Sequence, residues 1–353
     1  SKKTKEPLKD PEVIENIARI FEKEGADCWF TDDPKKFLGK KYKKEDYIKS
    51  NDIVEVWFDS GATHSYVLEK RKDLTWPASM YLEGSDQHRG WFHSSLLESC
   101  GTRGKAPFKS ILTHGFVVDG KGLKMSKSTG NIIAPEDILK KYGADILRTW
   151  VAASDYAEDL RLDYSILEQH AESYRKVRNT FRFILGNIGK IEYKDCLYYS
   201  ELQEIDKFVL ARIYELNALR KKAIKNYSFH NFYKSLFEFC SVDLSSFYFD
   251  ISKDILYCNK EDDIIRRSKT TILFHIYEFL TTCYAPVLCH TMEEVWRSYK
   301  TEKLESIHFK TSKSINEKWN NISLIKKWNK IKGLRKNINT AIEKARNDKI
   351  IGS

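Results

Sequence analysis

The sequence lacks the patterns that mark zinc-binding, disulfide-rich and membrane-spanning proteins. Its seven cysteines include no Cys-x-x-Cys pair and no Cys/His group at the spacing of metal ligands, so we expect no zinc in this segment. An odd number of irregularly spaced cysteines indicates reduced thiols in the core and favours a cytoplasmic protein. No run of about 18 apolar residues could span a bilayer, and the lysine-rich start has no apolar signal core. We therefore expect no membrane partner.

Acidic residues are scarce from Lys310 onward. Twelve basic residues stand there against three acidic ones, so most of the net charge of +10 lies in this block. Such a block attracts a phosphate backbone, and its binding would depend on salt. The chain is rich in lysine throughout, however, so a merely solvated surface is an equally good interpretation.

The pattern of apolar residues changes along the 353 residues, which suffice for two domains. Asp10-Pro11 and Gly25 enclose apolar residues at helical spacing and predict a helix between them. Residues 53–58 form an apolar run that predicts a buried strand ending in a turn at Asp59. Short strands and helices up to about residue 120 predict a parallel sheet covered by helices. Further helices are expected from Pro135 and over 144–153.

Long amphipathic helices are expected from Tyr164 onward. The first has a continuous apolar face from Leu167 to Ile188, while Arg175, Arg178 and Arg182 share another face. Further helical patterns cover 205–219, 232–255, 264–283, 290–299 and 322–345. Together they predict a helical bundle. The aromatic residues between Phe229 and Phe239 fit its core better than an exposed RNA-binding surface.

The segment Lys124-Met125-Ser126-Lys127-Ser128 is the strongest functional signal. Two lysines lie three positions apart in a small polar loop, with Gly122 and Gly130 on either side. Glycine adopts backbone angles that strain other residues, so such a loop can close over a ligand and reopen. Lysine supplies compact positive charge that can follow phosphate charge as it develops. A solvated basic turn would be the better interpretation of these residues without further context.

Two other segments supply that context. Residues 53–61 read I-V-E-V-W-F-D-S-G, and residues 83–92 read E-G-S-D-Q-H-R-G-W-F after an apolar pair. With the lysine loop, they resemble the second half of the catalytic domain of class I aminoacyl-tRNA synthetases, and the 83–92 string resembles the bacterial-type isoleucyl-tRNA synthetases. The segments 144–148 and 173–180 extend the resemblance, which reaches the last residues.

The resemblance implies an α/β fold followed by an all-α one. Residues 1–120 would form the second half of a Rossmann-like catalytic domain, and residues 121–163 the lysine (KMSKS) loop and a stem-contact connector. Residues 164–353 would form a helical-bundle anticodon-binding domain. The His-Ile-Gly-His signature of the first catalytic half is absent, as is the editing insertion. We therefore expect a fragment that is inactive alone, cut after the editing insertion and before the C-terminal extension.

The activity implied is that of an ATP-dependent ligase. It activates isoleucine as an aminoacyl adenylate and transfers the acyl group to tRNA(Ile), with ATP and Mg²⁺ as substrate and a monomeric protein expected. Lys124 and Lys127 would stabilise the developing pyrophosphate charge. The other expected ATP or adenylate contacts are Glu83, Gly84, Asp86, Gln87, His114, Met125, Ser126 and Ser128.

The remaining expectations concern the amino-acid pocket and tRNA. Trp91 is a candidate for the amino-acid pocket, although Trp57, Phe58, Trp91 and Phe92 are expected first in the core. Asp86, Gln87 and His88 could instead cap a helix or serve as polar turn residues. Arg175, Arg178 and Arg182 would contact tRNA. Two alternative functions stay open, a valyl-tRNA synthetase fragment and a non-catalytic tRNA-binding module.

Overall fold

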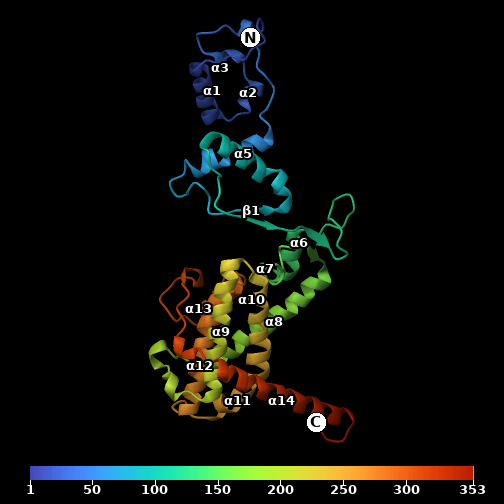
Figure 1. Ribbon diagram of the computed structural model, residues 1–353, viewed down its shortest axis with the longest axis vertical. Helices are drawn as coiled ribbons and strands as arrows, with labels where there is room; N and C mark the ends of the chain where they lie inside the picture. Colours follow the sequence, from blue (N-terminus) through green and yellow to red (C-terminus); the bar gives the residue numbers. More distant parts are fainter. Residues whose placement is uncertain (353) are drawn as a thin grey trace. The chain divides into compact units, whose positions relative to one another are not determined.

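The computed structural model describes residues 1–352, and the chain divides into two compact units, Ser1–Leu112 and Thr113–Ser353 (Figure 1). The second of these is the helical unit. None of the described helices is long and apolar enough to cross a lipid bilayer. The predicted boundaries at residues 120 and 163 stay predictions.

The first unit begins with the predicted helix. Helix α1 covers Pro11–Glu24, with Asp10 as its N-cap and Gly25 as its C-cap. Asp10 accepts hydrogen bonds from the backbone N–H of Glu12, from Lys41 Nζ and from Tyr42 Oη, which ties the helix start to a later segment. The other elements of this unit are α2 (Cys28–Thr31), α3 (Pro34–Leu38), α4 (Val56–Gly61), β1 (Tyr81–Gly84) and α5 (Trp91–Arg103).

The strand predicted over residues 53–58 is wrong. The side chain of Glu55 accepts hydrogen bonds from the backbone N–H groups of Trp57 and Phe58, and α4 begins directly after it. Ile53 is 77% exposed, and Trp57 and Phe58 are also exposed, so their predicted place in the core is wrong as well. A short apolar run has no periodicity that separates strand from helix, and the capping carboxylate decides for helix.

The strands of the described residues form two small sheets. Strand β1 is hydrogen-bonded to β2 (Ile111–His114), and β3 (Val117–Asp119) runs parallel to β4 (Leu160–Leu162). Residues 81–103 form a strand, a turn and a helix in succession, with a short 3₁₀ turn, η3 (Ser85–Arg89), between β1 and α5.

The helices predicted from Pro135 onward are present in the helical unit. The segments that begin at Pro135 and Ala144 are α6 (Pro135–Tyr142) and α7 (Ala144–Ala153). The bundle contains α8 (Tyr164–Asn187), α9 (Glu204–Asn226), α10 (Phe229–Glu238), a π-helical segment η6 (Phe239–Tyr248), α11 (Phe249–Cys258), α12 (Ile264–Tyr284), α13 (Cys289–Ser298) and α14 (Ile322–Asn347). In Figure 1, α14 projects from the bundle towards the C-terminus.

The core of this unit follows the apolar faces of the helices. Leu167, Phe181 and Ile184 on α8 are each 1% exposed or less, which confirms the predicted stripe. The aromatic residues from Phe229 to Phe239 are buried or half-buried, as expected for a core role. A second, smaller cluster contains Ile138, Trp150, Leu162 and Leu167.

Buried polar residues fix the helices against one another. The Asp145 carboxylate on α7 accepts hydrogen bonds from the N–H and hydroxyl groups of Thr291 at the start of α13. Arg148 donates to the carbonyl groups of Pro286 and Val287 in the link before α13. On α9, Asp206 is fully buried and pairs with Lys269 on α12, with 2.7 Å between Oδ1 and Nζ.

Candidate functional site

The turn after β1 brings the predicted ligands of the first unit together. Glu83 and Asp86 are exposed, and each carboxylate contacts only a close neighbour, the N–H of Gly84 at 3.2 Å and the amide of Gln87 at 3.3 Å. Gln87 Oε1 also accepts a hydrogen bond of 2.8 Å from the N–H of Trp91, the first residue of α5. Gln87 therefore caps the start of α5, as the alternative interpretation of this residue predicted. The exposed carboxylates can accept hydrogen bonds from hydroxyl or ammonium groups.

Trp91 is held in one orientation. Its ring stacks on Tyr81 with 4.2 Å between centroids and 9° between planes, and its indole N–H donates to the carbonyl of Ser60 at 2.8 Å. The residue is half-buried, whereas Phe92 beside it is buried. A tryptophan fixed on one face and at its N–H presents a rigid apolar surface, which suits an aliphatic ligand.

The lysine loop lies in the helical unit between β3 and α6. Gly122 and Gly130 have φ values of +83° and +68°, which confirms that both positions use the left-handed backbone region. Asn131 connects the two arms of the loop. Its amide donates to the Asp119 carboxylate at 2.9 Å, and its oxygen accepts from the N–H of Ser126 at 3.0 Å. The base of the loop is therefore ordered by hydrogen bonds.

The side chains of the loop divide into anchors and free groups. Met125 is half-buried and packs against the small cluster around Ile138. Lys124 and Lys127 are exposed. The hydroxyl groups of Ser126 and Ser128 lie 3.1 Å apart. Anchoring the methionine turns both ammonium groups to solvent, where they can meet an anion.

His114 lies at the end of β2, before the loop. Its Nδ1 donates to the carbonyl of Gly115 at 2.8 Å, which fixes the orientation of the ring. Within each unit, then, the predicted residues gather locally: Glu83 to Trp91 in the first, and His114 with the loop residues 124–128 in the helical unit.

The arginine face of α8 is exposed as predicted. Arg175, Arg178 and Arg182 are all exposed, and Arg178 lies 3.7 Å from Glu294. They are available for phosphate contacts.

The basic block after Lys310 is partly neutralised within the protein. Lys332 and Arg335 pair with Asp243 and Asp250, and Lys327 pairs with Glu204. Lys310 and Lys313 pair with glutamates as well. Five of the twelve cations therefore form ion pairs within the protein. These five help to hold the helical unit together, a role that the composition alone did not indicate.

Asn131 and Asp119 were not predicted as site residues. Asp119-Gly120 is a turn signal of the kind that precedes a tight hairpin, and it could have indicated an ordered loop base. Nothing in the sequence indicates the partner role of Asn131. No group of three or more His, Cys, Asp or Glu side chains in residues 1–352 is arranged to hold a metal ion.

Two family descriptions match successive parts of the chain. Residues 1–163 match the family described as tRNA synthetases class I (I, L, M and V), and residues 206–353 match the anticodon-binding domain of tRNA ligase. The chain is similar to the isoleucine–tRNA ligase of Pelagibacter ubique (strain HTCC1062), with 61% identity over 356 residues, which cover 100% of this chain and 39% of that protein. It is 45% identical to that of Syntrophotalea carbinolica, covering 98% of this chain and 38% of the relative. The chain thus spans about 39% of the length of these curated relatives.

Solved structures show the same fold at low identity. The LeuRS (agnB2) of Agrobacterium radiobacter K84, in a ternary complex with tRNA and LeuAMS, matches with a TM-score of 0.54 at 18% identity, covering 69% of this chain and 29% of that one. The methionyl-tRNA synthetase of Mycobacterium tuberculosis with methionyl-adenylate gives 0.53 at 18% identity, covering 62% and 44%. The predicted order of an α/β part followed by an all-α part is confirmed.

Proposed function

Because the chain belongs to the class I aminoacyl-tRNA synthetases and corresponds to part of a bacterial-type isoleucine enzyme, we propose that it contributes the lysine-loop half of the catalytic site and the anticodon-binding domain of an isoleucine–tRNA ligase. The substrates of the whole enzyme are isoleucine, ATP with Mg²⁺ and tRNA(Ile). The segment alone is inactive, and the whole protein is a cytoplasmic monomer.

The ordered lysine loop carries this proposal. Its base is fixed by Asn131 and its middle by Met125, so Lys124 and Lys127 project as free cations from an ordered frame. Pyrophosphate gains charge as the isoleucine carboxylate displaces it from the α-phosphorus of ATP. Cations placed beside that leaving group stabilise the transition state more than the ground state. Ser126 and Ser128 add hydroxyl donors at the same place.

The first unit supplies the groups for the adenylate. Glu83 and Asp86 are exposed acceptors suited to ribose hydroxyls or the substrate ammonium. Gly84 lies between them at the end of β1 and has no side chain, so a ligand can approach the backbone closely. The rigid face of Trp91 suits the aliphatic side chain of isoleucine. Mg²⁺ is expected on the phosphates of ATP, which supply most of its oxygen ligands in such sites.

The test is a graft into a complete enzyme. The Pelagibacter ubique ligase would carry this chain in place of its matching segment, and isoleucine-dependent pyrophosphate exchange would be measured. Replacing Lys127 with Ala should lower the exchange rate by about 10²-fold, the scale of one lost transition-state contact, and leave tRNA affinity nearly unchanged. Lys121→Ala is the matched control, because Lys121 is an exposed lysine of the same region outside the five-residue string.

Two outcomes would contradict the proposal. An exchange rate that is the same in Lys127→Ala and Lys121→Ala would remove the loop from catalysis. A graft that binds tRNA but never exchanges pyrophosphate would favour the non-catalytic RNA-binding module, and exchange that depends on valine would favour the valine enzyme.

A further inference from the structure

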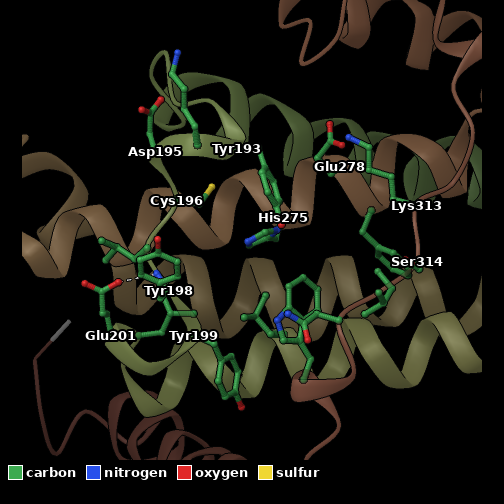
Figure 2. Close-up of a pocket in the computed structure, with 18 of the residues that line it drawn as sticks. Tyr193, Asp195, Cys196, Tyr198, Tyr199, Glu201, His275, Glu278, Lys313 and Ser314 are labelled. Atoms are coloured by element: carbon green, nitrogen blue, oxygen red, sulfur yellow. Dashed lines mark hydrogen bonds between the residues drawn. The ribbon is translucent and has the colours of Figure 1, made fainter.

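A cavity of about 900 Å³ opens in the helical unit, lined in part by Lys310 and Lys313 of the basic block and by none of the lysine-loop residues 124–128 (Figure 2). Its walls come from four parts of the chain. These are the link 193–202 between α8 and α9, Leu210 on α9, helix α12, and the segment 310–319. A volume of this size lies within the range of small-ligand sites.

Aromatic rings dominate the centre of this cavity. Figure 2 shows Tyr193 beside His275, and the two rings are 6.3 Å apart and nearly perpendicular. Trp319 is buried, and its ring stands edge-on to His275 at 4.9 Å. Tyr193 is 73% exposed and Tyr198 is 80% exposed, so two phenol rings at the rim offer free faces. Flat ligands stack on such faces, and stacking does not require one particular base.

His275 provides a polar group among these rings. Burial lowers the pKa of His275 to about 4, so its imidazole is neutral near pH 7. A neutral imidazole has one donor and one acceptor nitrogen. The rings of Tyr193, Phe274 and Trp319 pack around it, each nearly edge-on to the imidazole. This combination matches the donor and acceptor edge of a nucleobase better than it matches a phosphate.

The charged residues that line the cavity would not repel the phosphate backbone of a nucleic acid. Both oxygens of Glu278 accept hydrogen bonds of 2.7 Å from Lys310, so this carboxylate is neutralised. Lys313 pairs with Glu302 and remains 64% exposed, and Arg267 is exposed at the same cavity. The lining residues together hold one positive charge in excess.

We infer that this cavity binds one or two unstacked bases of a single-stranded RNA loop, with Tyr193 stacking on a base and His275 hydrogen-bonding to its edge. Arg267 and Lys313 contact the adjoining phosphates. The inference rests on the proposed function, in which this unit binds tRNA, and it adds the residues that would hold the splayed bases.

The experiment compares two RNA probes on the 353-residue chain. One is a stem-loop with about seven unpaired nucleotides, and the other is a blunt duplex of the same stem. Tyr193→Ala should weaken binding of the stem-loop about tenfold, the loss expected for one base stack, and leave duplex binding unchanged. Tyr257→Ala is the matched control, because Tyr257 on α11 is 62% exposed and lies outside the cavity. Both replaced side chains are largely exposed, so neither change should unfold the protein.

A second variant tests the polar contact. His275→Phe keeps an aromatic ring in the cavity and removes both nitrogens, so we expect it to reduce discrimination among loop bases while retaining part of the affinity. Equal stem-loop affinity in Tyr193→Ala and Tyr257→Ala, with strong binding by the unchanged chain, would overturn this inference and leave the proposed function intact. Tight binding of a free mononucleotide with no gain from the loop would also overturn it. Absence of any tRNA binding by the grafted enzyme would refute the proposed function as well.

Discussion

The buried ion pair between Asp206 and Lys269 gives the sharpest stability prediction. The two side chains are 0% and 1% exposed, and they join α9 to α12 in the centre of the bundle. Tyr248 donates a hydrogen bond of 2.7 Å to Asp206 Oδ1, and Ser268 donates to Oδ2. Lys269 Nζ also donates to Gln203 Oε1 at 3.2 Å. The Lys269 ammonium therefore supplies the positive charge that balances this buried carboxylate.

Replacing Lys269 with Met should lower the free energy of unfolding by about 3 to 5 kcal/mol. Methionine fills a similar volume, so the loss comes mainly from a buried carboxylate that keeps two hydroxyl donors but no counter-charge. Domains of ordinary stability have only about 5 to 15 kcal/mol in total, so the change would be large. The double variant Asp206→Asn/Lys269→Met removes both charges and should recover at least about 2 kcal/mol, because neutral replacement of a buried pair is often tolerated.

The assay is urea denaturation followed by far-ultraviolet circular dichroism, which reports mainly on the helices. Lys253→Met is the matched control, because Lys253 pairs with Asp250 at 3.2 Å while both side chains are nearly half exposed. An exposed pair of this kind contributes less than about 1 kcal/mol. The reasoning would fail if Lys269→Met cost no more than Lys253→Met, or if the double variant were no more stable than the single one.

Two further predictions concern charge. The bonds from Lys41 and Tyr42 lower the pKa of Asp10 from 3.8 to about 2, so its contribution to stability is complete above pH 3.8 and is lost as the pH falls through about 2. Asp10→Asn keeps an N-cap acceptor but removes the charge. The difference in urea midpoint between this variant and the unchanged chain should disappear as the pH falls from 3.8 to about 2. A difference that does not change with pH would contradict this. Neutralising Arg175, Arg178 and Arg182 together should reduce the slope of log Kd for tRNA against log salt by about 2 to 3 units if each contacts phosphate. An unchanged slope, measured by filter binding, would exclude all three from the interface.

The local parts of the fold could be predicted from sequence. Asp10 and Gly25 delimit α1, and the apolar stripe of α8 is buried as expected, because caps and helical spacing act over a few residues. The strand assigned to residues 53–58 is wrong, since their exposure depends on what packs against them and their short apolar run suits either element.

The site was predictable only where neighbours in sequence are neighbours in space. The lysine loop and the 83–92 turn are continuous, so their motifs show them directly. Asn131 acts through the carboxylate of Asp119, twelve positions away, and the wall of the cavity joins Tyr193, His275 and Trp319 from separate segments. Long-range packing of this kind leaves no periodic signal in the chain.

The bridge that Asn131 forms across the lysine loop affects the thermodynamics of ligand capture. A segment whose two arms already share hydrogen bonds has given up much of its conformational entropy during folding, so less is lost when an anion arrives. If the proposed function holds, the two cations would respond to phosphate by small rotations of their own side chains and of the flanking glycines, rather than by ordering a disordered chain. Preorganisation of this kind raises affinity without adding a contact to the ligand.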